Sequence, residues 1–277
     1  MASIDDGRRL VVTADDFGRS ASINQAVVRA HREGILTSAS LMVNGDSFEE
    51  AVDLAKDNPN LGVGLHLTLM CGRPTLTAAE IPGLLARHDA FRDDPVRAGL
   101  GFFFRRGLTP QIQGEIAAQI RKFRQTGLTL DHVDGHLNVH LHPTVFRLLM
   151  EHAREGGFRT IRLTHESLRL SRRMTRGRWV YRLSHAAVFG LLSEHARPIL
   201  LRKGIRHTDA VFGLLQNGCI NEDYLSKLIP ALPPGDSELY AHPSLDEFKH
   251  ELDALVSPKV RRLVDEHRIK LIRYCDL

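Results

Sequence analysis

Apolar runs alternate with amphipathic stretches along most of this chain, and that alternation constrains the fold more than any other feature. Buried strands of parallel sheets are short apolar runs, and parallel strands must be joined by crossover connections, usually helices. The repeated order of strand and helix therefore predicts an α/β protein with a mainly parallel sheet. The predicted strands cover residues 10–14, 35–43, 62–69, 128–141, 160–164, 238–241 and 270–274.

Capping residues mark where the predicted helices begin and end. Ser20 can accept a hydrogen bond from the first turn of a helix whose apolar residues Ile23, Val27 and Ala30 share one face, and Gly34 ends that helix. Further helices are predicted from a capping box at 47–50 to about residue 59, over 109–127 and over 143–155.

The number of predicted strands bears on the architecture. About eight strands over this length favour a closed or distorted (β/α) barrel of the TIM type, with an open doubly wound sheet as the alternative. No low-complexity linker divides the chain, so we expect residues 1–277 to form a single domain with inserted segments. The carboxyl ends of the strands of such a barrel share one rim, where active sites lie.

Cysteine usage and hydropathy exclude several classes of protein. The three cysteines, Cys71, Cys219 and Cys275, are far apart, which argues against a disulfide framework and a CxxC zinc knuckle. The first residues lack the pattern of a secretory signal, and no stretch is long and apolar enough to cross a membrane. We therefore expect a cytoplasmic protein.

Positive charge is concentrated in residues 167–206. This segment holds nine arginines and Lys203 against one acid, Glu194, whereas the whole chain carries a net charge of only +4. A solvated helical face would explain the segment, and contact with an anionic membrane surface or with nucleic acid are the functional alternatives.

Polar side chains alternate with apolar ones over residues 131–142. Because side chains alternate between the faces of a strand, one face is predicted to carry His132, Asp134, His136, Asn138 and His140. The other face carries only apolar residues and glycine. A strand of this kind packs its apolar face against helices and lines a wet or metal-containing site with the other.

Two further segments point to the same site. In strand 62–69, His66 shares a face with Thr68, so it would converge with the histidines of 131–142 if the two strands are neighbours. Asp15 and Asp16 follow the first strand, where two adjacent carboxylates are costly to desolvate without a cation or donors. One carboxylate binding a divalent metal while the other acts as a base is the functional interpretation, and a pair that caps the next helix is the alternative.

His242 comes directly after the predicted strand 238–241 and before Pro243. On the rim of a barrel it is a candidate general acid, since a departing amine must be protonated as its bond to carbon breaks. A histidine that caps the turn before proline is the alternative.

These motifs carry a family resemblance. Residues 13–18 (TADDFG), 64–67 (GLHL), 131–136 (DHVDGH) with His140, and 241–243 (AHP) are similar to the motifs of the YdjC-like carbohydrate deacetylases. The match runs in order from residue 9 to 243 and covers most of the chain. Loop residues in 72–85 and 102–104 further resemble the hopanoid-biosynthesis-associated branch, known as HpnK.

The resemblance implies a distorted (β/α) barrel that removes an N-acetyl group from an amino sugar. It implies one divalent metal, with zinc first and magnesium, manganese, nickel or cobalt as alternatives. A metal-activated water would attack the acetamide. By motif, the expected metal ligands are Asp16, His66 and His136, the expected base is Asp15 and the expected acid is His242. Asp134 and His140 are expected around this set. From its position just inside the end of the predicted strand 160–164, Arg162 is expected to hold Asp15 in place, with a surface salt bridge as the alternative.

In the hopanoid branch the substrate would be an N-acetylglucosamine unit on a lipid polyol. The basic segment then gains a second interpretation. Trp179, Leu183, Ala187 and Leu191 recur at i+4 spacing, which favours an amphipathic helix that faces the core, with peripheral contact with the cytoplasmic membrane as the alternative. Phe102 to Phe104, followed by two arginines, could make the same contact. A homodimer is a further expectation of the resemblance.

Other functions stay open at this point. A soluble chito-oligosaccharide deacetylase would differ only in the group attached to the sugar. The Asp and His inventory also allows a metal-dependent phosphoesterase. A non-catalytic sugar-binding barrel is a further alternative, but the positions of the base and the acid are intact. An arginine-rich nucleic-acid-binding protein is a further class, but no recognised binding motif is present, so we expect no nucleic-acid partner.

Overall fold

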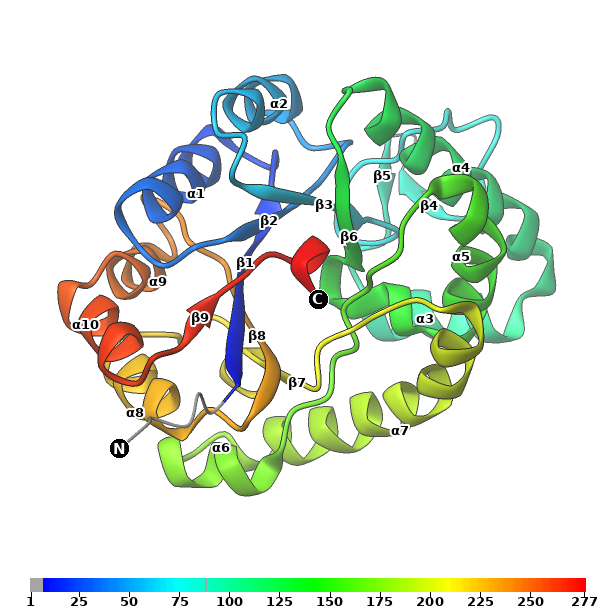
Figure 1. The fold of residues 1–277 in the computed structure, drawn as a ribbon. Helices are drawn as coiled ribbons and strands as arrows, with labels where there is room; N and C mark the ends of the chain where they lie inside the picture. The colour runs from blue at the N-terminus through cyan, green and yellow to red at the C-terminus, as the bar shows by residue number, and fades with distance from the viewer. Residues whose placement is uncertain (1–6, 88) are drawn as a thin grey trace.

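The computed structural model describes residues 7–87 and 89–277 as an α/β fold around one parallel sheet (Figure 1). The sheet has seven strands in the order β6-β3-β2-β1-β8-β7, and β9 pairs with the beginning of β1. A separate antiparallel hairpin is formed by β4 and β5. The strands are β1 (Arg8–Phe17), β2 (Ser38–Leu41), β3 (Gly62–Leu67), β4 (Leu85–Arg87), β5 (Ala90–Phe91), β6 (Leu130–Gly135), β7 (Ala210–Phe212), β8 (Gly235–Ala241) and β9 (Lys270–Leu271).

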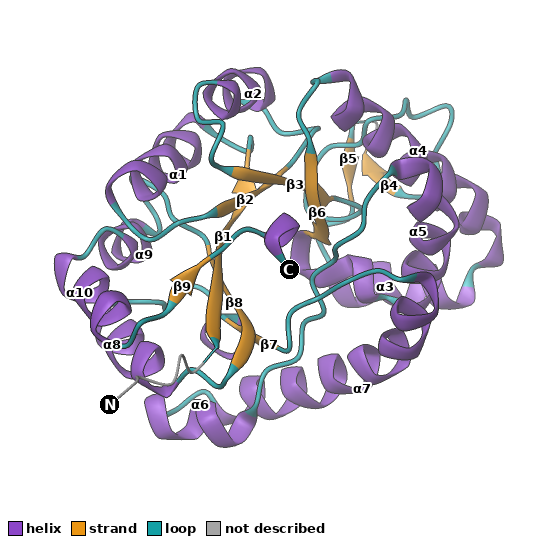
Figure 2. Cartoon of the chain, in the orientation of Figure 1, coloured by secondary structure: helices purple, strands orange, loops and turns teal. Residues whose placement is uncertain are grey.

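Helices surround the sheet on its outer side (Figure 2). In the described residues, none of them is long and apolar enough to cross a membrane. The helices are α1 (Ala21–Glu33), α2 (Phe48–Lys56), α3 (Pro95–Phe104), α4 (Thr109–Gln125), α5 (Pro143–Gly156), α6 (Leu168–Met174), α7 (Trp179–Lys203), α8 (Glu222–Ala231), α9 (Lys249–Leu255) and α10 (Pro258–Glu266). Short 3-10 turns lie at η1 (Arg106–Leu108), η2 (His136–Leu141), η3 (Leu214–Gln216) and η4 (Tyr274–Asp276).

Residues 160–165 connect the two ends of the sheet. The Arg162 N–H donates to the Val133 carbonyl of β6, and the Val211 N–H of β7 donates to the His165 carbonyl. The strand predicted at 160–164 therefore lies beside β6 as expected, but it makes isolated bridges in place of a ladder. The α/β class and the parallel sheet are confirmed, while the named strands stop short of a regular (β/α) barrel.

The sheet separates an apolar layer from a polar interior. On β1, Leu10, Val12 and Ala14 belong to the main hydrophobic core. On β6, Val133 joins the same core, whereas the adjacent Asp134 is buried among polar partners on the opposite face. This alternation follows from the period of two along a strand, and it leaves the inner face for the site.

Capping residues in the sequence correctly predict the beginning of α1 but not the contacts at the beginning of α2. The Ser20 side chain accepts a hydrogen bond from the Ile23 N–H and begins α1 as predicted. The prediction of a capping box before α2 is wrong, because the Ser47 side chain makes no capping hydrogen bond. The Glu50 carboxylate instead accepts from the Asn24 side chain on α1, at 2.9 Å. A partner from another helix therefore replaces the local one.

The apolar stripe predicted to bury α7 faces outward. Trp179, Leu183 and Leu191 are all exposed, so the core-facing interpretation of this stripe is wrong. The buried side of α7 carries Arg182 and Ala196 in their place. Sequence periodicity correctly groups the residues of one helix face, but it does not say whether anything covers that face.

Candidate functional site

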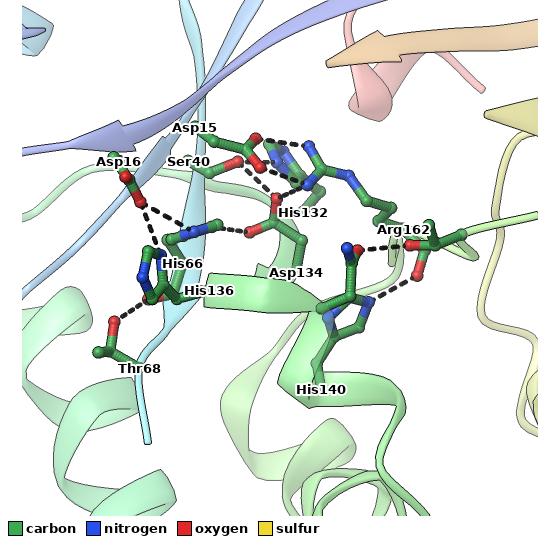
Figure 3. A network of polar contacts seen from close by, with 12 residues as sticks. Asp15, Asp16, Ser40, His66, Thr68, His132, Asp134, His136, His140 and Arg162 are labelled. Carbon is green, nitrogen blue, oxygen red and sulfur yellow. Dashed lines mark hydrogen bonds and ion pairs between the residues drawn. The ribbon is translucent and has the colours of Figure 1, made fainter. Parts of the chain in front are cut away.

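Two adjacent carboxylates, Asp15 and Asp16, lie at the carboxyl end of β1 and are both buried. The register between β1 and β2 shifts after Ala14, and Asp16 has a φ of +64°, in the left-handed region that residues with a side chain rarely adopt. The two carboxylates consequently reach different partners (Figure 3). Strained backbone of this kind clusters at functional sites.

Two histidines converge on Asp16. Its Oδ1 lies 2.9 Å from Nδ1 of His136 and 3.3 Å from Nε2 of His66, while its Oδ2 accepts from Arg19 at 2.7 Å. Asp16, His66 and His136 offer ligand atoms within 4.8 Å of one another, close enough to hold one metal ion. Burial would raise the pKa of Asp16, but the facing rings of His136 and His66 hold that pKa well below its usual value. The three residues expected as metal ligands are therefore brought together.

A carboxylate on the neighbouring strand orients His66. β3 pairs with β6, and Nδ1 of His66 lies 2.8 Å from Oδ1 of Asp134, with both side chains buried. Burial lowers the pKa of His66, but the carboxylates of Asp134, Asp16 and Asp15 together outweigh burial and raise that pKa to about 10. An imidazole that donates one N–H to a carboxylate can present its other nitrogen to a metal, which displaces the proton. Asp134 is thus placed to direct Nε2 of His66 toward Asp16.

Arg162 is a buried cation that three carboxylates share. Its guanidinium donates to both oxygens of Asp15, at 2.7 and 2.8 Å, which confirms the expected contact. It also lies 2.8 Å from Asp134 and 2.9 Å from Glu238. Burial would lower the pKa of Arg162, but these carboxylates, Asp134 first, raise it well above its usual value. The guanidinium carbon lies over the Tyr240 ring, 4.3 Å from its centroid, where a cation is attracted to the ring.

A second buried group, Asp15 with His66 and Asp134, also meets the distance condition for a metal ion. Both of its carboxylates already pair with Arg162, so their charge is compensated within the protein. The group at Asp16 supplies two imidazole nitrogens and a carboxylate oxygen, a donor set that zinc accepts with one position open for water. The residues around Asp16 therefore fit a divalent metal better than the second group does.

His242 lies at the end of β8, with its Nε2 3.9 Å from Oδ2 of Asp15. Its backbone N–H donates to the buried Glu251 carboxylate at 2.6 Å. The His242 side chain is 21% exposed, whereas that of Asp15 is 4% exposed. The backbone thus anchors the turn, and the imidazole faces a cleft that reaches the surface.

A cleft of about 390 Å³ opens onto this site. Its polar end is lined by Asp15, His136 and His242, so the candidate base, one candidate ligand and the candidate acid border the same space. Most of its remaining lining is apolar. The walls come from the η2 turn, from α3 and from α7, and the two helices contribute Pro95, Val96, Tyr181, His185, Val188, Phe189 and Leu192.

The predicted alternation of polar residues holds only to the end of β6. Residues 136–141 form a 3-10 turn in which Leu137 and Asn138 have φ values of +53° and +56°. The expectation that His140 shares a face with the ligands is therefore wrong. Its Nε2 lies 3.0 Å from the Arg162 carbonyl, and burial lowers the pKa of His140 to about 4. His140 supports the backbone of Arg162 and lies outside the candidate metal group.

His132 and Asn138, the other two polar residues predicted on that face, also contact residues outside the candidate metal group. Nε2 of His132 lies 3.0 Å from the Ser40 hydroxyl, and the ring stacks on Tyr274 with centroids 4.4 Å apart. Asn138 accepts a hydrogen bond from the Thr164 hydroxyl at 2.7 Å. Neither residue belongs to the group of possible metal ligands around Asp16.

Two buried carboxylates belong to the site although neither is predicted from the sequence. Glu238 pairs with Arg162 and accepts a hydrogen bond from the Tyr274 hydroxyl. Glu251 accepts the backbone N–H of His242. A carboxylate inside an apolar strand needs a buried partner, so the sequence around Glu238 could have indicated that it belongs to the site. Glu251 lies on α9, and nothing in the sequence around it indicates a role in the site.

Comparisons with known proteins show which family and which fold this chain is similar to. Residues 9–266 match the YdjC-like protein family. A carbohydrate deacetylase of Brevibacillus brevis is 42% identical over 150 residues, which is 53% of this chain and 56% of that protein. The chain thus spans little more than half of this relative. A mouse carbohydrate deacetylase is 32% identical over 312 aligned positions, 97% of this chain and 94% of that protein.

A solved structure supports the fold. A proposed cellobiose-phosphate cleavage protein of Enterococcus faecalis superposes with a TM-score of 0.76 at 22% identity, covering 97% of this chain and 98% of that one. At this identity the likeness concerns the fold alone. Because the family match extends over nearly all of the sequence, the chain belongs to the YdjC-like protein family.

Proposed function

We propose that this protein is a metal-dependent carbohydrate deacetylase that removes the N-acetyl group from an N-acetylglucosamine unit. The observation that carries the proposal is the convergence of His66 and His136 on Asp16, beside the pair of Asp15 with Arg162. Membership of the YdjC-like family and relatives named carbohydrate deacetylase support the reaction class. We further regard residues 1–277 as one domain with a distorted (β/α) barrel fold.

In this proposal Asp16, His66 and His136 hold one divalent ion, with zinc favoured by the mixed nitrogen and oxygen donors. A divalent ion bound there supplies Lewis acidity, which polarises an acetamide carbonyl and lowers the pKa of a water molecule. Magnesium, manganese, nickel and cobalt accept overlapping ligand sets, so the metal has to be identified by measurement.

The protein's own side chains divide the proton transfers. Asp15 accepts the proton of the attacking water, and its bidentate contact with Arg162 keeps the carboxylate in one orientation. His242, whose Nε2 lies 3.9 Å from Oδ2 of Asp15 on the same cleft, donates a proton to the nitrogen of the leaving amine. Asp134 orients His66, and His140 supports the Arg162 backbone. The reaction yields acetate and a free amino sugar.

We propose a lipid-linked substrate, an N-acetylglucosaminyl hopanoid. The apolar cleft wall, including Val188, Phe189 and Leu192, supports an apolar group next to the sugar. A soluble chito-oligosaccharide is the alternative substrate, because the same catalytic residues would serve it. We place the enzyme in the cytoplasm, consistent with free cysteines at Cys71, Cys219 and Cys275, and a homodimer is part of the proposal.

Mass spectrometry of the metal-replete protein, incubated in parallel with an N-acetylglucosaminyl hopanoid and with chitobiose, tests the proposal. Loss of one acetyl group from the hopanoid alone is the expected result. Loss from chitobiose alone would retain the chemistry and discard the lipid. Loss from neither substrate would contradict the deacetylase assignment, and phosphate esters would be tested next. The Asp15→Asn variant is the matched control, since it should retain metal without turnover.

A further inference from the structure

An uncovered apolar stripe runs along α7. Val180 is 85% exposed and Leu191 is 75% exposed, and Trp179, Leu183 and Val188 on the same helix are exposed as well. The stripe from Trp179 to Leu191 is about 18 Å long at 1.5 Å per residue. Large exposed apolar patches on a globular protein mark interaction surfaces.

α3 carries a second stripe of the same kind. Val96, Leu100, Phe103 and Phe104 lie on one face of this helix at i, i+4, i+7 and i+8, and all four are exposed. Val96 and Phe104 are 73% and 71% exposed, whereas the adjacent Phe102 is buried against the protein. The exposure therefore belongs to a particular face of α3.

Both stripes reach the mouth of the cleft. Val96 of α3 and Val188 of α7 line the cleft that holds Asp15 and His242 at its polar end. We call the exposed apolar residues of the two helices the apolar rim. The apolar rim consists of Val96, Leu100, Phe103, Phe104, Trp179, Val180, Leu183, Val188 and Leu191.

Exposed arginines border the apolar rim. α6 and α7 follow one another along one edge of the molecule (Figure 1), and arginine side chains of α6 line a surface groove together with Trp179 and Leu183. The Arg172 guanidinium lies 5.7 Å from the centroid of the Trp179 ring. The acidic residues on these helices and just before α3 are Asp93, Asp94 and Glu194. The exposed arginines on α6 or close in sequence to rim residues are Arg97, Arg105, Arg106, Arg169, Arg172, Arg173, Arg176 and Arg178.

We infer that the apolar rim docks on an anionic lipid surface, with the cleft mouth facing the lipid. Its apolar side chains enter the boundary between headgroups and acyl chains, and the bordering arginines contact lipid phosphates. The attachment is peripheral, because no helix in the described residues could cross a bilayer. This inference goes beyond the proposed function and does not depend on which sugar is deacetylated.

Charge and chemistry favour a lipid over other partners. A two-fold dimer through the rim would bring the same arginines of two copies toward each other, which is repulsive. Nucleic acid would match the arginines, but its phosphate backbone offers nothing for an uncovered apolar stripe to bury. An anionic bilayer interface satisfies both features at once.

Co-sedimentation with lipid vesicles tests the inference without any substrate, so its outcome is separate from that of the deacetylase assay. We expect the protein to bind phosphatidylcholine vesicles that contain phosphatidylglycerol, more weakly in added sodium chloride and hardly at all when phosphatidylglycerol is omitted. Val180→Ser with Leu191→Ser should lose most of the binding. Arg172→Gln with Arg173→Gln should weaken it by about fivefold per arginine.

Matched controls lie at the other end of α7. Leu201→Ser replaces a side chain that is 81% exposed but outside the apolar rim, and Arg202→Gln with Lys203→Gln removes two charges there. Both controls should bind vesicles like the unaltered protein. Equal loss in the controls, binding to duplex DNA that matches vesicle binding, or a dimer that Val180→Ser with Leu191→Ser dissociates would each overturn the inference.

Discussion

Arg162 and Asp15 form a fully buried, bidentate ion pair, with N–O distances of 2.7 and 2.8 Å across 147 positions of sequence. The guanidinium that fixes Asp15 also pairs with Asp134 and Glu238. It therefore links the candidate base to the carboxylate that orients His66. The geometry of the proton acceptor and that of the candidate metal group consequently depend on one side chain.

Arg162→Met should strongly destabilise the protein. Removing the guanidinium leaves three buried carboxylates without their shared cation, and breaking a buried pair costs about 3–5 kcal/mol. Urea denaturation measures the change. Arg147→Met is the control, because Arg147 makes an exposed pair with Glu151 on α5 and should cost less than about 1 kcal/mol. Similar losses in the two variants would contradict the role of Arg162.

His242→Ala should lower kcat without releasing metal. A positioned general acid contributes about 10² to 10⁴ in rate, and the His242 ring lies outside the group around Asp16. Steady-state kinetics and metal content are measured on the same preparation. His195→Ala, on the exposed side of α7, should leave both quantities unchanged. A full rate without His242 would assign the acid to another group.

Glu166 should make stability depend on pH. Burial raises its pKa from 4.5 to about 7, although its Oε2 accepts the Leu215 N–H at 2.9 Å. Between these values the unfolded chain has lost the proton that the folded protein still holds, so the free energy of unfolding falls as pH rises from 4.5 to 7. The raised pKa of Glu166 changes the free energy of unfolding by at most about 3 kcal/mol over this pH range.

Denaturation at several pH values, with Glu166→Gln beside the unaltered protein, measures this effect. The variant should flatten the profile in that window, because its amide does not titrate. Glu194→Gln, at an exposed position of α7, should leave the slope as it was. An unchanged slope in Glu166→Gln would show that Glu166 ionises normally.

Two glycines should respond to alanine in opposite ways. A Cβ at Gly64 on β3 would lie 2.5 Å from Nδ1 of His132, and overpacking of this kind costs about 1–3 kcal/mol. A Cβ at Gly190 within α7 would meet nothing within 4 Å, and alanine there should add about 0.5–1 kcal/mol. Thermal unfolding of the two variants should therefore shift in opposite directions, and equal shifts would contradict the packing.

Much of the site was predictable because it depends on periodicity and strand order. Asp16 breaks the alternation along β1 through its positive φ. His66, by contrast, lies where alternation along β3 predicts, on the inner face of the sheet. The pairing of β3 with β6 then places His66 beside Asp134, as expected for neighbouring strands. These relationships need only a sheet with one apolar and one polar face.

The remaining errors arise where tertiary contacts override local patterns. Leu137 adopts a positive φ without any glycine to signal it, and that turn moves His140 out of the predicted row. Glu50 binds Asn24 in place of the cap expected for its own helix. The stripe through Leu191 has the period of a buried face, but the structure leaves it exposed. A short stretch of sequence does not show that a turn of this kind forms, nor whether other residues cover one face of a helix.

Metal content and turnover of single variants test the central claim most directly. Elemental analysis should find about one divalent ion per chain in the unaltered protein and in Asp15→Asn, but little in Asp16→Asn and His66→Ala. Deacetylation should be lost in all three variants. Stoichiometric metal in Asp16→Asn, or the same loss of metal in Asp15→Asn as in the other two, would contradict the division between metal ligands and base.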